Sequence, residues 1–312
     1  MKSDMTIKEK MKRYGSLMPF LIPCVALALL FSYIPMVGIL MAFKGKINLF
    51  LYEPFEAFVK APWSMENFAK IFENEDFMKI LGNTLLISVL KIAVLFPIPI
   101  IFALLFAEIK NPTASKLMQS VMYLPYFLSW AVATGIFMNM FSSYGMVNTI
   151  CIKLGLMSKD SPVLWYQNPS KFLFLMLFTG GWKDIGWSMI VYVSAILSID
   201  STYYEAARLD GAGKMQQIFL ITLPLIKGTI VTMFILRICY ILDAGFDQIF
   251  TMLNNSTRDK WEIIGTYVYR VGLQQSDYGF STAVGLLNSV AALVIIIAGN
   301  FIVKKFSGKG IW

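Results

Sequence analysis

Six long apolar runs, separated by polar segments, dominate the pattern along the chain. They cover residues 17–43, 80–107, 120–141, 172–197, 225–250 and 281–303. Each exceeds the about 20 residues that a helix needs to cross roughly 30 Å of hydrocarbon. Because a helix satisfies its own backbone hydrogen bonds in lipid, the pattern predicts six transmembrane helices. The first run is too long for the apolar core of a secretory signal, and no small-residue cleavage site follows it, so we expect it to be retained.

Composition and charge agree with an all-α integral membrane protein. Of the 312 residues 57% are hydrophobic and 15% charged, and the mean hydropathy is +0.64. The net charge of +8 gathers near the ends of the apolar runs, which favours a membrane surface over nucleic acid. Basic residues flank the first and last runs: Lys2, Lys8, Lys10, Lys12, Arg13, Lys304, Lys305 and Lys309. With six spans we therefore expect both termini in the cytoplasm, although the long first outer loop also carries lysines.

Several kinds of chemistry are excluded or unsupported. The chain has no histidine, which excludes a histidine-based metal site, haem or proton relay. Its three cysteines are scattered and odd in number, so neither a disulfide framework nor a metal site is indicated. No G-x-x-x-x-G-K-[ST] occurs, so the usual phosphate-binding loop for a nucleotide is missing. We expect this chain to bind no cofactor.

The polar segment between the fourth and fifth runs, residues 201–224, has a local pattern of its own. It reads "STYYEAARLDGAGKMQQIFLITLP". Thr202 and Glu205 fit a capping box, and Gly211 suits the left-handed turn that ends a helix. Gly213 loosens the restart, and Pro224 stands where the fifth membrane helix is expected to begin. The segment predicts a short helix, a glycine turn and a second helix on the cytoplasmic face.

This segment resembles the EAA loop of permeases from binding-protein-dependent ABC importers. The matching residues are Glu205, Ala206, Ala207, Gly211, Ile221, Leu223 and Pro224. The "DGAG" stretch, which is Asp210, Gly211, Ala212 and Gly213, is similar to the carbohydrate branch of these permeases. Further stretches, among them "YLPYFLSWAVATGIF" and "GGWKDIGWSMIVYVSAI", are similar to the LplB-like subgroup for oligosaccharides and polysaccharide fragments. The resemblance covers nearly the whole chain.

The resemblance implies the type I importer fold, with six transmembrane helices and a cytoplasmic coupling helix that docks on an ATPase. The expected organisation is a cytoplasmic tail at 1–16, a first helix and long external loop at 17–79, a core of five helices at 80–303, and a cytoplasmic tail at 304–312. The implied partners are a second, different permease chain, an ABC ATPase dimer that uses ATP and Mg, and an extracellular sugar-binding lipoprotein. The implied location is the bacterial cytoplasmic membrane, and the implied role is non-catalytic.

Polar residues inside the apolar runs are the candidates for a substrate pathway, since such residues are costly in lipid. In "GWKDIGW", Asp184 and Trp187 share one helix face and offer a carboxylate and an aromatic ring to a sugar. The alternative is that Lys183 and Asp184 form an ion pair that packs helices. In the fifth run, Tyr240, Asp243 and Asp247 would form one helical stripe, part of which is equally compatible with an external interface.

Other positions leave alternatives open. Trp130 is a weaker pathway candidate, because single tryptophans in membrane helices often serve packing. Lys91 either faces the protein interior or snorkels to the surface, and Pro97 and Pro99 are expected to kink the second span. The long outer loops, residues 44–79, 142–171 and 251–280, are suited either to docking an external partner or to packing across the helix ends.

The rival functions are a permease for another solute, an ion-coupled secondary transporter and a membrane enzyme. A secondary transporter would give the helix-turn-helix at 201–224 no role. For an enzyme, the chain lacks histidine and any nearby pair of nucleophile and base.

Overall fold

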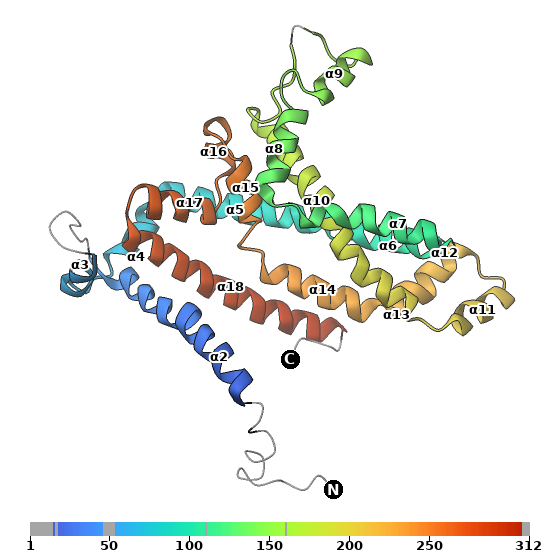
Figure 1. Ribbon diagram of the computed structural model, residues 1–312, viewed down its shortest axis with the longest axis horizontal. Coiled ribbons are helices and arrows are strands. Elements are labelled where there is room, and N and C mark those ends of the chain that lie inside the picture. The colour runs from blue at the N-terminus through green and yellow to red at the C-terminus, as the bar shows by residue number, and fades with distance from the viewer. Residues whose placement is uncertain (1–14, 16–17, 46–53, 110, 160, 308–312) are drawn as a thin grey trace. The chain divides into compact units, whose positions relative to one another are not determined.

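The computed structural model describes residues 15, 18–45, 54–109, 111–159 and 161–307, and within these ranges it contains helices and no strand (Figure 1). The chain divides into two compact units. One combines Met1–Ile71 with Val271–Leu286, and the other combines Phe72–Arg270 with Leu287–Trp312. The residues discussed below as a site all belong to the second unit.

In the first unit, one long helical segment is followed by short helices. The segment consists of α2 (Met18–Ala28), η2 (Leu29–Tyr33) and η3 (Ile34–Phe43), and α3 (Pro54–Lys60) and α4 (Glu66–Glu73) come next. Asn67 of α4 donates hydrogen bonds to the carbonyls of Ala42 (3.1 Å) and Lys44 (2.8 Å). Residues 44–79, taken from the sequence as the first outer loop, thus contain short helices, and α4 is hydrogen-bonded to the end of the long segment.

Three helical segments are each long and apolar enough to span a membrane alone: Pro19–Phe43, Glu75–Ala107 and Tyr278–Phe301. The second comprises α5 (Glu75–Leu95) and α6 (Pro97–Ala107), which are separated only by the residue before Pro97, one of the two prolines predicted to kink this span. The third lies within α18 (Tyr278–Ser307). Since proline at the start of α6 has no N–H to donate, the interruption falls where the sequence predicts it.

Among the described residues, three bent pairs of helical pieces pass the same test only when both pieces of a pair are counted together, so the number of spans is three, or up to the predicted six if each bent pair is one span. The first piece of one pair, α7 (Pro112–Tyr123) with η4 (Leu124–Phe127), meets α8 (Trp130–Met140) at 101°. The helix α10 (Pro169–Leu197) meets α11 (Ser201–Leu209) at 67°. The elements α12 (Lys214–Gln217), η5 (Ile218–Thr222) and α13 (Leu223–Leu225) together meet α14 (Lys227–Cys239) at 63°.

The prediction of one continuous helix over residues 225–250 is wrong. Helix α14 ends at Cys239, and α15 (Phe246–Met252) begins only after a turn. Two consecutive residues of that turn, Ala244 and Gly245, have φ of 53° and 81°. A right-handed helix cannot continue through left-handed residues, so an apolar run of sufficient length is here divided into two helices.

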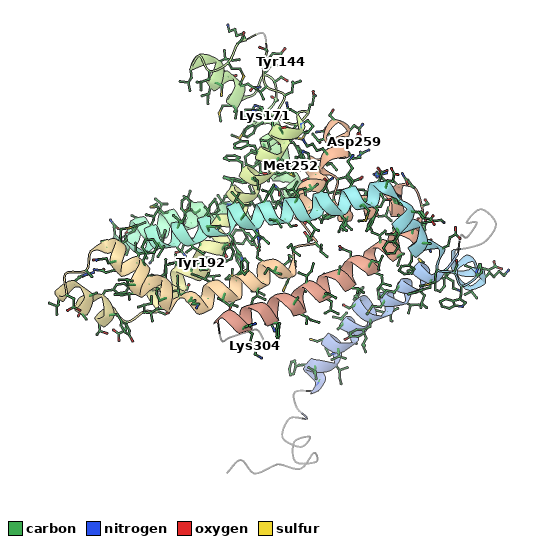
Figure 2. All side chains as sticks on the ribbon, turned by 180° about the vertical axis from the view of Figure 1, so that it is seen from behind. Tyr144, Lys171, Tyr192, Met252, Asp259 and Lys304 are labelled. Carbon is green, nitrogen blue, oxygen red and sulfur yellow. The ribbon has the colours of Figure 1, made fainter. Side chains whose placement is uncertain are left out.

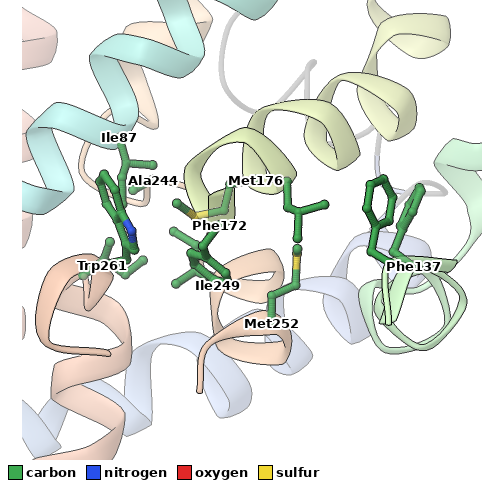
Figure 3. Packing of buried hydrophobic residues seen from close by; sticks show 11 residues of the cluster. Ile87, Phe137, Phe172, Met176, Ala244, Ile249, Met252 and Trp261 are labelled. Carbon is green, nitrogen blue, oxygen red and sulfur yellow. The ribbon is translucent and has the colours of Figure 1, made fainter. Parts of the chain in front are cut away.

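Two apolar clusters form the core of the second unit. One includes Phe137, Phe172 and Met252 (Figure 3), and the other includes Met189 and Tyr192. Figure 2 marks Met252 and Tyr192, one member of each cluster. Most of these buried residues come from α5, α6, α8, α10 and α15, so these helices form the scaffold that carries the site.

The longer loops of this unit are ordered by buried polar and aromatic side chains. They contain α9 (Met146–Lys153), α16 (Asn255–Trp261) and α17 (Ile264–Tyr269), and η6 (Arg270–Gln274) leads towards α18. The buried Asn148 donates to the carbonyl of Val163 (3.0 Å) and accepts from the indole of Trp165 (2.9 Å). Trp261 donates to the carbonyl of Pro169 (2.6 Å). The loop tryptophans thus pack across the helix ends.

Candidate functional site

The polar loop of residues 201–224 forms the first part of the site. Its first helix, α11, is capped by Asp200, whose carboxylate accepts from the Thr202 amide (2.9 Å). The predicted capping box of Thr202 and Glu205 is wrong, because the helix begins at Ser201 and Thr202 already lies inside it. Glu205 instead accepts a hydrogen bond from the Ser201 hydroxyl (3.3 Å). The hydrogen bonds from Thr202 hold the pKa of Asp200 below its usual range.

The glycine turn takes the predicted form. Gly211 has φ of 79°, and the amide of Ala212 donates back to the carbonyl of Ala207 (2.8 Å), which closes α11. Gly213 then precedes α12, and its amide donates to the side chain of Gln216 (2.8 Å). The second helix of the predicted pair therefore exists, although it is a short α-helical turn that continues as η5.

The loop is tied to its surroundings while one face stays free. Lys214 pairs with Glu108 at the end of α6 (2.5 Å), and the hydroxyls of Tyr204 and Thr222 are 2.9 Å apart. Several residues of the loop are exposed, including Glu205, Ala206, Asp210, Gly211, Gly213 and Pro224, whereas Ala207, Ala212, Ile221 and Leu223 are partly buried. Leu209, the last residue of α11, is 90% exposed.

Two adjoining cavities among the helices form the second part of the site. The polar cavity, of about 220 Å³, has both charged and aromatic walls. Its polar and aromatic lining residues are Ser88, Lys91, Trp130, Asp184, Arg237, Tyr240, Asp243 and Gln248. The aromatic cavity, of about 450 Å³, is lined by Tyr126, Trp187 and Tyr192, and it shares Asp184, Arg237 and Tyr240 with the polar cavity. The shared residues make the two cavities neighbours.

Asp184 and Trp187 share a helix face, as predicted, and both line the aromatic cavity. The alternative ion pair between Lys183 and Asp184 does not form. Lys183 instead donates to the backbone carbonyls of Tyr126 (2.7 Å) and Leu128 (2.5 Å). The cation nearest to Asp184 is Arg237 of α14, at 3.8 Å, which makes a loose pair between two partly exposed side chains.

The predicted stripe of Tyr240, Asp243 and Asp247 is wrong, because α14 ends before Tyr240. Asp243 lies in the turn, where its carboxylate accepts from the amides of Gly245 (2.9 Å) and Phe246 (3.0 Å). Tyr240, Asp243 and the weaker candidate Trp130 all line the polar cavity. Asp247 is exposed and lines neither cavity.

A buried network centred on Lys91 completes the polar cavity, and sequence reasoning left its role open. Lys91 donates to the carbonyl of Ala244 (2.8 Å) and to the side chain of Gln248 (2.6 Å). Gln248 donates in turn to the carbonyl of Met176 and to the hydroxyl of Thr179, both at 2.7 Å. Lys91 therefore faces the protein interior. A lone lysine within an apolar run was the available signal, but its partners lie more than 150 residues away.

The cavities have the chemistry that a sugar requires. The indole of Trp187 stacks on the phenol of Tyr126, with ring centroids 4.5 Å apart and planes within 9°. Aromatic faces suit the apolar faces of sugar rings, while carboxylate, guanidinium and phenol groups exchange hydrogen bonds with hydroxyls. Among the residues that the structure describes, no three acidic or cysteine side chains group as they would around a metal ion.

Comparison with known proteins adds independent evidence. A model of the family described as "Binding-protein-dependent transport system inner membrane component" matches residues 99–309. Protein LplB of Bacillus subtilis is 35% identical over 97% of this chain and 92% of its own length. The polygalacturonan/rhamnogalacturonan transport system permease protein YteP of the same organism is also 35% identical, over 98% of this chain and 92% of its own.

A solved structure is similar over the same extent. One chain in the crystal structure of a bacterial alginate ABC transporter, in complex with an alginate pentasaccharide-bound periplasmic protein, has a TM-score of 0.86 and 33% identity to this chain. The match covers 98% of this chain and 99% of that one.

Proposed function

Because the chain belongs to the family of binding-protein-dependent transport system inner membrane components, with the type I ABC importer permease fold, we propose a specific transport role. It is the permease subunit through which an ATP-driven importer moves oligosaccharides or polysaccharide fragments across the membrane. The relatives named above for polygalacturonan, rhamnogalacturonan and alginate support a carbohydrate substrate.

The observation that carries the proposal is the shape of the polar loop. A capped helix, a left-handed glycine and a short second helix extend beyond the bend at the end of α10, with the exposed Leu209 next to the turn. A short exposed helix that ends in an ordered turn is suited to a groove on another protein. We assign the ATPase contact to this loop: Glu205, Ala206, Ala207, Asp210, Gly211, Ala212, Gly213, Ile221, Leu223 and Pro224.

The two cavities supply the substrate pathway in this proposal. Asp184 and Tyr240 belong to both cavities, Trp187 belongs to the aromatic one, and Trp130 and Asp243 belong to the polar one. Asp247 is not part of the pathway, since it is exposed and lines neither cavity. A sugar would stack on Trp187 while Asp184 accepts hydrogen bonds from its hydroxyls.

The proposed transport role requires three kinds of partner: an ATPase, a second permease and a sugar-binding protein. Without a phosphate-binding loop, the permease depends on a separate ABC ATPase dimer that binds ATP and Mg, and it catalyses no reaction itself. A second permease, encoded as a different chain, would complete the pathway. An extracellular sugar-binding lipoprotein would deliver the substrate, and the periplasmic protein in the alginate complex supports this kind of partner. ATP binding would close the ATPase pair and switch the pathway between its two sides.

The proposed location is the cytoplasmic membrane of a bacterium, with both termini in the cytoplasm. The basic residues at the two ends support this orientation. It places the polar loop of residues 201–224 on the side where ATP is available.

The proposal is tested by substituting Gly211 in the assembled importer. Valine at φ of 79° is strained, and a Cβ at this position meets nothing of this chain within 4 Å, so within the permease the substitution acts through the backbone. Gly211→Val should abolish ATP-driven uptake of labelled oligosaccharide while the chain still inserts. Gly211→Asn, which tolerates this conformation better, should retain most of the uptake. Undiminished uptake by Gly211→Val would contradict the assigned coupling role.

A further inference from the structure

The bent third span contains an elbow at residues 124–129, where the helical hydrogen-bond ladder stops. Helix α7 and η4 end at Phe127, and Leu128 and Ser129 are extended, with ψ of 138° and 152°. In an unbroken helix the carbonyl of Leu128 would accept from the amide of Val132. That amide instead donates to the Ser129 hydroxyl (3.3 Å). The break therefore leaves carbonyls of this bent segment without a donor from the helix, and they need another one.

The buried ammonium of Lys183, from the middle of α10, supplies that donor. Its nitrogen lies 2.5 Å from the carbonyl oxygen of Leu128, 2.7 Å from that of Tyr126 and 3.5 Å from that of Pro125. An ammonium has three N–H groups, so three carbonyls match its capacity. The same nitrogen lies 5.4 Å and 5.6 Å from the ring centroids of Tyr126 and Trp130, within the range of cation–π attraction.

Two further residues of α10, Gly186 and Trp187, contact α7 and the elbow beside Lys183. A Cβ on Gly186 would lie 1.9 Å from the carbonyl oxygen of Met122, so only glycine lets α10 approach α7 this closely. Trp187 follows and stacks on Tyr126. Lys183, Gly186 and Trp187 are at i, i+3 and i+4, so one face of α10 holds the elbow with a cation, a close backbone contact and an aromatic ring.

We propose that Lys183 is a positioning residue for transport, whose ammonium fixes the elbow at residues 124–129. The elbow carries Tyr126, which lines the aromatic cavity, and is followed directly by Trp130, which lines the polar cavity. Lys183 thereby sets the walls of both cavities, although it lines neither of them itself. The transport part of this proposal rests on the proposed function, whereas the structural part does not.

The experiment measures the elbow directly in the assembled complex. Spin labels are attached at Lys116→Cys on α7 and Met138→Cys on α8, after Cys24, Cys151 and Cys239 have been replaced. Lys183→Met keeps the length of the side chain and removes every donor, and it should broaden the distribution of inter-label distances. Lys183→Arg keeps several N–H donors and should preserve a narrow distribution. Lys171→Met, on the exposed part of the same helix, is the matched control and should change nothing.

Uptake is measured in parallel and expressed per inserted complex. Lys183→Met should lower the maximal rate on the order of tenfold, since small misplacements of a site are costly, with the half-saturating substrate concentration nearly unchanged. Lys183→Arg should transport at close to the maximal rate of the wild type. If Lys183→Met does not reach the membrane, Lys183→Gln, with two donors on a shorter side chain, replaces it.

The outcomes separate the two proposals. An unchanged label distance in Lys183→Met, or equal changes in Lys171→Met, would overturn the positioning role. If the wild-type complex transports no oligosaccharide, the proposed function fails, while the label distances still decide the role of Lys183. A broadened distance with full uptake would also overturn the proposal, because the elbow would then have no bearing on transport.

Discussion

At the scale of single residues, Gly245 and Lys91 depend on each other. Gly245 has φ of 81°, and a Cβ placed there would lie 2.5 Å from the Lys91 nitrogen. The glycine therefore satisfies two needs at once, a left-handed backbone and room for a buried ammonium. The sequence around Gly245 does not show that room for an ammonium is required there, because Lys91 stands in another span.

This dependence predicts the effect of Gly245→Ala. Left-handed strain costs about 1–2 kcal/mol, and displacement of Lys91 from the Ala244 carbonyl adds to it. We expect a lower unfolding temperature of the purified complex and reduced uptake. Gly228→Ala is the control: it lies in α14 with nothing within 4 Å, so it should be neutral or slightly stabilising. A Gly245→Ala complex as stable as the Gly228→Ala complex would contradict this account.

At the scale of elements, the spans that are single helical segments were predictable and the broken ones were not. Hydrophobic runs identify the segments at Glu75–Ala107 and Tyr278–Phe301, because apolar composition alone decides whether they can span. The breaks after Phe127 and after Cys239 lie inside the apolar runs at 120–141 and 225–250. Each is held by a lysine from a distant helix, Lys183 or Lys91, so the decisive contact is long-range and a local pattern does not contain it.

The candidate site divides in the same way. The glycine turn at Gly211 depends on local chemistry and was predicted with its left-handed conformation. The cap of α11 was assigned to the wrong side chains, because Asp200 and Thr202 both precede the alanines at a plausible distance. The pathway residues Asp184 and Trp187 share a face, as helical spacing requires. The stripe of Tyr240, Asp243 and Asp247 was wrong because the helix stops before them, although Tyr240 and Asp243 still line the polar cavity.

The cap of α11 leads to a prediction about pH. Since the folded-state pKa of Asp200 lies below its ordinary value of 3.8, the cap stabilises α11 fully above that value. Its contribution is lost as the pH falls through the lower, folded-state pKa. Amide hydrogen exchange of Ser201–Leu209, corrected for its intrinsic pH dependence, should rise there in the wild type. Asp200→Asn caps without titrating and should not show this rise. The same rise in both proteins would assign the effect to another group.

At the scale of the larger unit, two helices connect the polar loop with the cavities. Helix α6 has Pro99 in the wall of the aromatic cavity, and Glu108, directly after its last residue, is paired with Lys214 of the loop. Helix α10 carries Asp184 and Trp187 and leads at its far end into α11. In the proposed mechanism, α6 and α10 are the two helices through which a displacement of the loop would reach the cavity walls.

Asp184 and Asp247 provide a test of the proposed pathway and its control. Asp184 lines both cavities opposite Arg237, whereas Asp247 is exposed and lines neither. Replacing a carboxylate by an amide weakens a hydrogen bond to a sugar hydroxyl, which corresponds to on the order of tenfold in rate. Asp184→Asn should therefore lower oligosaccharide uptake by about that factor. ATP hydrolysis by the complex should remain close to the wild-type rate, because the loop at residues 201–224 is unchanged.

Asp247→Asn makes the same chemical change outside the cavities and should transport at close to the wild-type rate. Equal losses in the two variants would show that the acids act through stability or through an outer surface, and equal retention would remove Asp184 from the pathway. Only a loss confined to Asp184 fits a sugar that passes between α10 and α14. In that case Arg237→Gln should reproduce the loss, since the guanidinium stands across the same shared wall.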